Sequence, residues 1–177
     1  MKAARGGYDD PGKTTVAPAN RGGAFAYTSV MDAERIRAYL LTLPHAVETM
    51  QWGANLVFWV GDKAIGGKMF ALINLDEDQD TQVISYSAGP ERYPELLEVE
   101  GIFPAPYMAR IHWVAVEHWH VFRPAEWERQ LQQAHAITLD KLPPKVRATL
   151  ALPAKEQKRL IAEGRKRIAA KAKAKKS

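Results

Sequence analysis

The chain has 177 residues, of which 46% are hydrophobic and 25% are charged, and it contains no cysteine. These values are typical of one globular domain and exclude a fully disordered chain, a collagen-like rod and a coiled coil. The lack of thiols also excludes disulfides, thiolate metal ligands and cysteine nucleophiles.

No apolar run reaches the ~18 residues that a membrane-spanning helix needs. The N-terminus is basic but lacks the apolar segment that follows in a secretory signal. We therefore expect a cytoplasmic protein that has no membrane partner.

The net charge of +5 is distributed unevenly along the chain. Residues 1–30 carry +2, and residues 31–140 combine eight basic with sixteen acidic residues. Residues 141–177 combine thirteen basic with two acidic residues. An acidic body is thus followed by a strongly basic segment, which is the kind of segment that nucleic acid or anionic lipid attracts.

The first helix is predicted after a leader without apolar periodicity. Residues 1–30 are rich in glycine and proline, which predicts disorder and makes Met31 a candidate start of the protein. Residues 32–43 have helical character, because Asp32 can accept backbone N–H groups of a first turn and Pro44 disfavours helix before it. The apolar residues of this segment recur at helical spacing: Ile36, Tyr39, Leu40 and Leu43.

The middle of the chain has strand character. Runs of β-branched, aromatic and alternating apolar residues predict four strands, at residues 56–60, 68–75, 82–87 and 111–119. The connections between the first three are too short for crossover helices, so these strands pair antiparallel. A short helix is predicted over residues 91–98, and residues 101–107 are predicted to form an irregular loop stiffened by prolines.

The last third of the sequence is predicted to be helical. A long helix starts at Pro124 and ends before Pro143, and two further helical segments cover residues 145–152 and 154–174. The long helix has one apolar face, formed by Trp127, Leu131, Ala134, Thr138 and Leu142.

Helix, antiparallel strands and then helices indicate an α+β fold, with an antiparallel β-sheet (a meander) covered on one face by helices. The domain organisation that we expect is a disordered leader over residues 1–30, an α+β domain over residues 31–142, and a basic tail over residues 143–177 that is helical or partly disordered.

Two loops resemble ligand-binding motifs but lack essential positions. Residues 76–80 space three aspartates as a calcium loop does, but Thr81 and Ser87 stand where an EF-hand needs glycine and glutamate. Residues 61–68 lack the first glycine and the hydroxyl residue of a phosphate-binding loop. We therefore expect a polar hairpin turn and an ordinary glycine-rich bend.

Three histidines, in and just after the last predicted strand, are separated by even numbers of residues. On an extended strand His112, His118 and His120 share one face, and the last two could converge on zinc. Glu117 points to the opposite face, and no other carboxylate lies at a matching spacing. A zinc site and solvent-exposed histidines both remain open; we favour the second, and expect no metal.

Motifs of enzymes are missing from the sequence. It has no Gly-x-Ser-x-Gly elbow and no dinucleotide-binding Gly-x-Gly-x-x-Gly. We therefore expect a protein that is not an enzyme and binds no cofactor. A small-molecule pocket remains an alternative, in the region of Tyr107, His112, Trp113 and Trp119.

Ten cations lie within the twenty-two residues from 155 to 176. Such a segment binds phosphates without sequence preference and with steep salt dependence, because each contact releases condensed counterions. A solubilising C-terminus is the alternative interpretation. The candidate phosphate-binding residues of this tail are Lys155, Lys158, Arg159, Arg165, Lys166, Arg167, Lys171 and Lys173.

Several short segments occur in the same order as in the MmcQ/YjbR-like proteins: Leu43-Pro44, residues 56–58, residues 67–72, residues 106–108 and residues 112–114. The chain resembles this family over about residues 32–142. The resemblance implies a CyaY-like α+β fold, no known enzymatic activity, and DNA binding of a double-wing type that has been inferred from shape. It also implies a surface that merits a test, formed by Lys68, Tyr107, Arg110, His112 and Trp113.

We therefore expect a non-enzymatic DNA-binding protein. The tail contacts phosphates without reading the sequence, while Lys68, Arg110 and His112 orient the duplex or another anionic partner. The alternative is a protein-interaction or adaptor module, in which the sheet and the acidic body recruit a basic protein partner and the tail only keeps the protein in solution.

Overall fold

The computed structural model describes residues 30–76 and 82–175. The predicted leader, except for Val30, and most of the acidic turn at residues 76–80 lie outside the described residues. The helices are α1 (Ala33–Thr42), α2 (Gly89–Leu97), α3 (Pro124–Asp140), α4 (Pro144–Leu150) and α5 (Ala154–Ala174). The strands are β1 (Ala46–Gln51), β2 (Asn55–Val60), β3 (Lys68–Asn74), β4 (Ile84–Ser87), β5 (Ile102–Pro104) and β6 (Trp113–Val116). Three 3-10 turns complete the list: η1 (Lys63–Ile65), η2 (Ala109–Ile111) and η3 (Trp119–Val121).

The six strands form one antiparallel sheet in the order β1-β2-β3-β4-β6-β5. The expected α+β fold is confirmed: β1 to β4 follow one another as a meander, and β5 lies outside β6 at the edge. Two strands were not predicted. The sequence of β1 mixes apolar with polar residues and none of them is buried, while β5 has only three residues and ends in Pro104.

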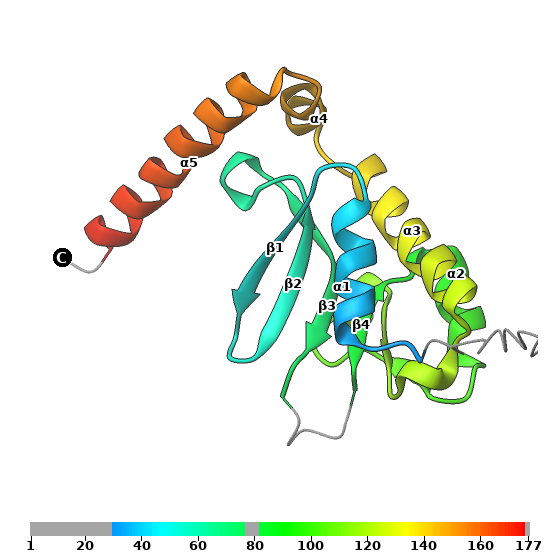
Figure 1. The fold of residues 1–177 in the computed structure, drawn as a ribbon. Coiled ribbons are helices and arrows are strands. Elements are labelled where there is room, and N and C mark those ends of the chain that lie inside the picture. The colour runs from blue at the N-terminus through cyan, green and yellow to red at the C-terminus, as the bar shows by residue number, and fades with distance from the viewer. Residues whose placement is uncertain (1–29, 77–81, 176–177) are drawn as a thin grey trace, which may run out of the picture.

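Helices cover one face of the sheet, and Figure 1 shows α1 and α3 lying over the strands. Asp32 caps α1 as predicted, because its carboxylate accepts the backbone N–H of Arg35 at 2.8 Å. The predicted apolar face of α3 is confirmed, since all of its residues are buried. This covered face contains the largest fully buried side chains, among them Phe58, Phe70, Tyr86 and Trp127.

The opposite face of the sheet, here called the open face, carries a smaller apolar cluster. Its buried members come from β2, β3, β6 and the loop after β5: Val57, Trp59, Leu72, Ala105, Trp113 and Ala115. A register shift between β2 and β3 turns two consecutive residues of β3, Phe70 and Ala71, toward the covered face. Met69 and Leu72 on either side of them therefore face the open side.

The last predicted strand is shorter than expected. Only Trp113–Val116 pair in the sheet, whereas η2 and η3 occupy both flanks of the predicted segment. The reason is local: the N–H of His112 donates to the carbonyl of Ala109, which closes a tight turn and holds His112 at a φ of 57°. The prediction of an extended strand over residues 111–119 is wrong at both ends.

The basic tail folds as two helices. Val146 and Leu150 of α4 belong to the main core, so the core extends beyond residue 142. From α4, α5 extends past the β1–β2 side of the sheet and carries the C-terminus away from α1 and α3 (Figure 1). It contacts η1 through Gly164, where an added Cβ would lie 2.3 Å from the carbonyl oxygen of Ala64. Among the described helices, none combines the length and hydropathy needed to cross a bilayer.

Candidate functional site

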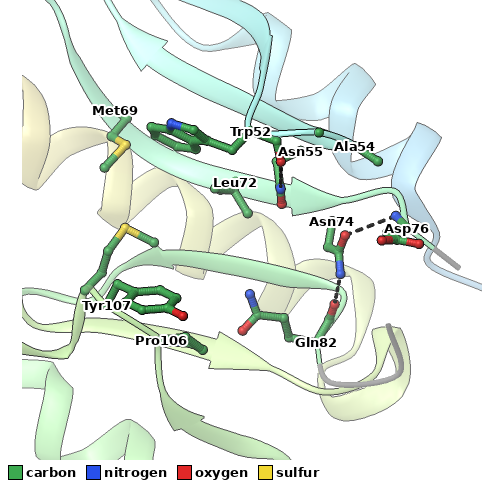
Figure 2. Close-up of a pocket in the computed structure, with 12 residues that line it drawn as sticks. Trp52, Ala54, Asn55, Met69, Leu72, Asn74, Asp76, Gln82, Pro106 and Tyr107 are labelled. Atoms are coloured by element: carbon green, nitrogen blue, oxygen red, sulfur yellow. Dashed lines mark hydrogen bonds between the residues drawn. The ribbon is translucent and has the colours of Figure 1, made fainter. Parts of the chain in front are cut away.

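A groove of about 700 Å³ lies on the open face, between the β1–β2 hairpin and the loop before η2. Figure 2 shows Trp52 and Tyr107 on opposite walls of this groove, with Leu72 between them. Both aromatic side chains are exposed, Trp52 to 63% and Tyr107 to 106%. Two large rings on the surface contribute little to burial and are typical of residues that contact a partner.

Trp52 occupies an unusual position in its turn. Residues 52–54 connect β1 to β2, and Trp52 and Gly53 have φ values of 48° and 81°. Two successive residues with positive φ form a left-handed backbone that glycine and asparagine adopt more readily than other residues. The Asn55 side chain closes the turn by donating to the Trp52 carbonyl at 2.8 Å. A tryptophan therefore stands where asparagine is the preferred residue for folding.

Tyr107 repeats this feature on the opposite wall. The N–H of Met108 donates to the carbonyl of Ala105 at 3.1 Å, so residues 105–108 form a β-turn. Pro106 is its second residue, and Tyr107, with a φ of 64°, is its third. This is the pattern of a type II turn, whose third position favours glycine or asparagine. A left-handed backbone costs an ordinary L-residue about 1–2 kcal/mol, so each ring is held outward at an energetic cost.

Amide side chains supply the polar groups of the groove. The Gln82 amide points into it from beside β4 (Figure 2), and its Oε1 is buried without a hydrogen-bond partner among the described residues. Asn74 is engaged at both ends, since its Nδ2 donates to the Gln82 carbonyl at 3.3 Å and its Oδ1 accepts from the Asp76 N–H at 3.0 Å. None of the described residues that line the groove is a cation. The groove therefore suits a flat, neutral group with donors and acceptors at its edge.

The cations of α5 form a second candidate site, and its two halves differ. In the first half Arg159 pairs with Glu156 at 2.9 Å and with Glu163 at 2.8 Å. The hydrogen bond that the guanidinium donates to Glu156 is the main cause that raises the pKa of Arg159. After Gly164 the helix contains no acidic residue, and Arg165 pairs with Asp62 at 2.6 Å. The remaining tail cations predicted from the sequence are all exposed: Lys155, Lys158, Lys166, Arg167, Lys171 and Lys173.

The sequence matches the YjbR family model over residues 41–137. The chain belongs to the YjbR family. A similar solved structure is the crystal structure of protein DR2400 from Deinococcus radiodurans, described with a DUF419 domain. The two chains are 25% identical with a TM-score of 0.59, and the match covers 70% of this chain and 91% of that one. No curated protein matches the sequence.

In this YjbR-family protein, the three body residues that were predicted to orient an anionic partner differ in their contacts. Lys68 points toward the end of α3, where its Nζ donates to the Lys141 carbonyl at 3.1 Å. Arg110 is exposed in η2, three residues after Tyr107. His112 packs edge-on against Tyr93, with ring centroids 5.4 Å apart. Lys68 is the first residue of β3, whereas Arg110 and His112 precede β6. Because β4 lies between β3 and β6 in the sheet, Lys68 is not on a strand next to the other two residues.

The three aromatic residues of the predicted pocket do not line a common cavity. Tyr107 is on the groove wall, whereas Trp113 is buried in the apolar cluster of the open face. Trp119 lies on the covered side, where its ring centroid is 5.7 Å from that of Trp127 and its carbonyl accepts the indole N–H of Trp127. The prediction is wrong because β6 ends at Val116, after which the chain turns into η3.

The histidines of the same segment do not share a strand face either. His118 and His120 stack on each other, with ring centroids 4.9 Å apart, at the start of η3 and within it. His112 lies at the end of η2 instead, against Tyr93. Within residues 30–76 and 82–175, no group of three or more His, Asp or Glu residues is arranged to hold a metal ion.

The site residues predicted from the sequence did not include Trp52, Asn55 and Gln82, which line the groove. The signal for Trp52 was the Trp-Gly pair directly before a strong strand, which reads as a hairpin turn once β1 is recognised. Asn55 and Gln82 have no comparable signal in the sequence. One is an ordinary strand residue and the other an ordinary loop residue, and they line the groove only because the sheet brings them together.

Proposed function

We propose that this YjbR-family protein is a non-enzymatic nucleic-acid-binding protein whose helix α5 contacts the phosphate backbone. The observation that carries the proposal is the charge of α5 after Gly164, where cations occur without any acidic residue. The cations of this half are Arg165, Lys166, Arg167, Lys171 and Lys173, and Lys175 follows directly after the helix. Each phosphate that they neutralise releases condensed counterions, which favours binding at low salt.

The helical form of the tail supports this proposal. A helix of 21 residues is about 32 Å long, and the major groove of B-DNA is wide enough to admit an α-helix. The half of α5 that lies beyond Gly164 starts beside β1 and η1, where Arg165 pairs with Asp62. The cations that follow Arg165 are exposed, so they are accessible to a large polyanion. Lysines that contact phosphate contribute affinity but no sequence preference.

The acidic body favours one orientation of the complex. Residues 31–140 contain twice as many acidic as basic residues, so they repel a polyanion, while α5 attracts it. Arg110 is the exposed cation of η2 and provides a second contact beside the groove, in the region that the family resemblance marks. Lys68 and His112 already have partners within the protein, and their role in binding is expected to be smaller.

A fluorescence-anisotropy titration with a labelled duplex at two salt concentrations tests the proposal. The triple variant Lys166→Gln, Arg167→Gln, Lys171→Gln is expected to weaken binding at low salt and to reduce the salt slope by about 2–3, at about 0.9 per lost contact. The control variant Lys155→Gln, Lys158→Gln, Arg159→Gln removes the same charge from the half of α5 that contains Glu156 and Glu163, and should weaken binding less. Absence of duplex binding by the full chain in dilute buffer, or equal binding by the first variant, would contradict the proposal.

A further inference from the structure

We infer that the groove on the open face holds an unpaired base of single-stranded nucleic acid against Trp52 and Tyr107. This inference rests on the proposed function and names its substrate class. Both rings are exposed, both flank the groove, and both occupy turn positions that favour glycine or asparagine. Two independent turns thus hold an aromatic ring on the surface at the expense of backbone energy, which is a feature of binding sites.

The chemistry of the groove suits a nucleobase. Leu72 and Met69 give it an apolar floor against which a flat ring packs, and every base has a face that stacks on an aromatic side chain. Gln82 points its amide into the groove, and the Oε1 of this amide is buried without a partner among the described residues. An amide that offers one donor and one acceptor matches the edge of an unpaired base.

The charges around the groove separate the base from the phosphate. The described lining residues include Asp76 but no lysine or arginine, so a phosphate inside the groove would be unpaired and repelled. Cations occur outside it instead, at Arg110 after the Tyr107 turn and along α5 beyond β1. A single nucleic-acid strand that places one base in the groove can place its phosphates near these cations. This arrangement keeps the negative charge of the phosphates out of the groove and next to positive charge.

A single strand fits these observations better than a duplex. In a duplex the bases are stacked and paired, so their faces and pairing edges are unavailable to Trp52, Tyr107 and Gln82. Duplex DNA can still bind to α5 through its phosphates. The groove therefore adds affinity for single strands to a general attraction for polyanions.

The test replaces each ring with a residue that favours the local turn conformation. Trp52→Asn creates an Asn-Gly pair at two successive positions of positive φ, and Tyr107→Asn places asparagine at the third position of the type II turn. Both changes remove a ring while keeping a residue that is favourable for the local backbone. The double variant should therefore keep the melting temperature of the unchanged protein, and a loss of binding cannot then be ascribed to unfolding.

The measurement is fluorescence anisotropy on the full chain with four labelled probes of one length: single-stranded DNA and RNA of the same mixed sequence, the DNA duplex, and an abasic single strand. The unchanged protein should bind the single strands at least about tenfold more tightly than the abasic strand, the range expected for stacking one base. The double variant should lose this advantage and bind the duplex as before. The DNA and RNA arms report which sugar the site prefers.

The outcomes distinguish the two proposals. Equal binding of the single-stranded and abasic probes, or no effect of the double variant, overturns the base site and leaves the role of α5 intact. Loss of single-strand binding in the double variant, with no effect of the Lys166/Arg167/Lys171 variant on any probe, keeps the base site and contradicts the role of α5. If none of the four probes binds at low salt, both proposals are wrong, and the groove and the tail serve another partner.

Discussion

The two faces of the sheet are built from the same strands, yet their aromatic residues have different environments. On the covered face Phe58, Tyr86 and Trp127 are fully buried beneath or within the helices. On the open face Trp52 and Tyr107 extend into solvent from turns with positive φ. The comparison indicates that the covered face stabilises the fold, whereas the open face combines a smaller buried cluster, which includes Trp59 and Trp113, with two rings that are presented for contact.

The largest expected effect is on the covered face. Trp127→Ala removes a fully buried indole and the hydrogen bond to the Trp119 carbonyl, so we expect a loss of about 3–5 kcal/mol in the free energy of unfolding. Trp52→Ala, the matched change on the open face, should cost less than about 0.5 kcal/mol. Urea denaturation of both variants measures the difference. A similar loss for the two tryptophans would remove the distinction between the faces.

The second effect concerns the anchoring of α5 beside the open face. Replacing glycine with alanine in a helix normally adds about 1 kcal/mol of stability, but a Cβ on Gly164 would lie 2.3 Å from the Ala64 carbonyl oxygen. We therefore expect Gly164→Ala to destabilise the docked helix by about 1–3 kcal/mol. Amide hydrogen exchange along α5 would report faster exchange in the variant.

A control separates docking from helix propensity. Ala162→Gly changes an exposed position of α5 two residues earlier and should cost only the intrinsic propensity of about 1 kcal/mol. If Gly164→Ala stabilised α5 instead, the contact with η1 would not hold the helix, and the cations would not be fixed next to the sheet.

The sequence predicted the covered face better than the open one. Helix periodicity identified the buried stripe of α3 and the α1 stripe around Ile36 and Leu40, because burial on one side of a helix leaves a repeating pattern. Edge strands leave a weaker repeating pattern in the sequence. The residues of β1 are partly exposed and mix polar with apolar types, so β1 was missed, and with it the turn that holds Trp52.

The turns and the groove could not be predicted from the spacing of residues along the sequence. His112, His118 and His120 have the alternation of a strand, yet the hydrogen bond from the His112 N–H to the Ala109 carbonyl turns the chain before the strand begins. The groove joins Trp52, Gln82 and Tyr107 from three distant parts of the chain. Their proximity follows from the order of the strands in the sheet, which a local pattern does not reveal.

A smaller effect is expected for His135, a titratable residue that is buried on the covered face. Burial lowers the pKa of His135, although the hydrogen bond between its Nε2 and the Pro44 carbonyl, at 2.8 Å, acts in the opposite direction. In the unfolded chain the imidazole has its ordinary pKa of about 6.5 and takes up a proton at a higher pH than it does in the folded protein. The contribution of His135 to stability is therefore present above about pH 6.5 and is lost as the pH falls toward the lower folded pKa.

His135→Gln keeps a hydrogen-bond donor but does not titrate in this range. We expect its melting temperature to fall less between pH 7.5 and pH 5 than that of the unchanged protein, when both are measured by thermal unfolding in the same buffers. Equal pH dependence in the unchanged protein and the His135 variant would contradict a buried neutral imidazole.

The smallest expected effect concerns Tyr107 on the open face. It separates the contribution of the ring to stability from that of the left-handed backbone. Tyr107→Gly removes the left-handed penalty of about 1–2 kcal/mol but adds the flexibility of glycine in the unfolded chain, so a net gain of about 0.5 kcal/mol is expected. Tyr107→Ala removes the same ring and keeps the penalty, so its stability should stay within about 0.5 kcal/mol of the unchanged protein. Both are measured by urea denaturation. If both variants instead lost more than about 1 kcal/mol, the ring would be stabilising the fold, and the aromatic wall of the groove would have a structural role.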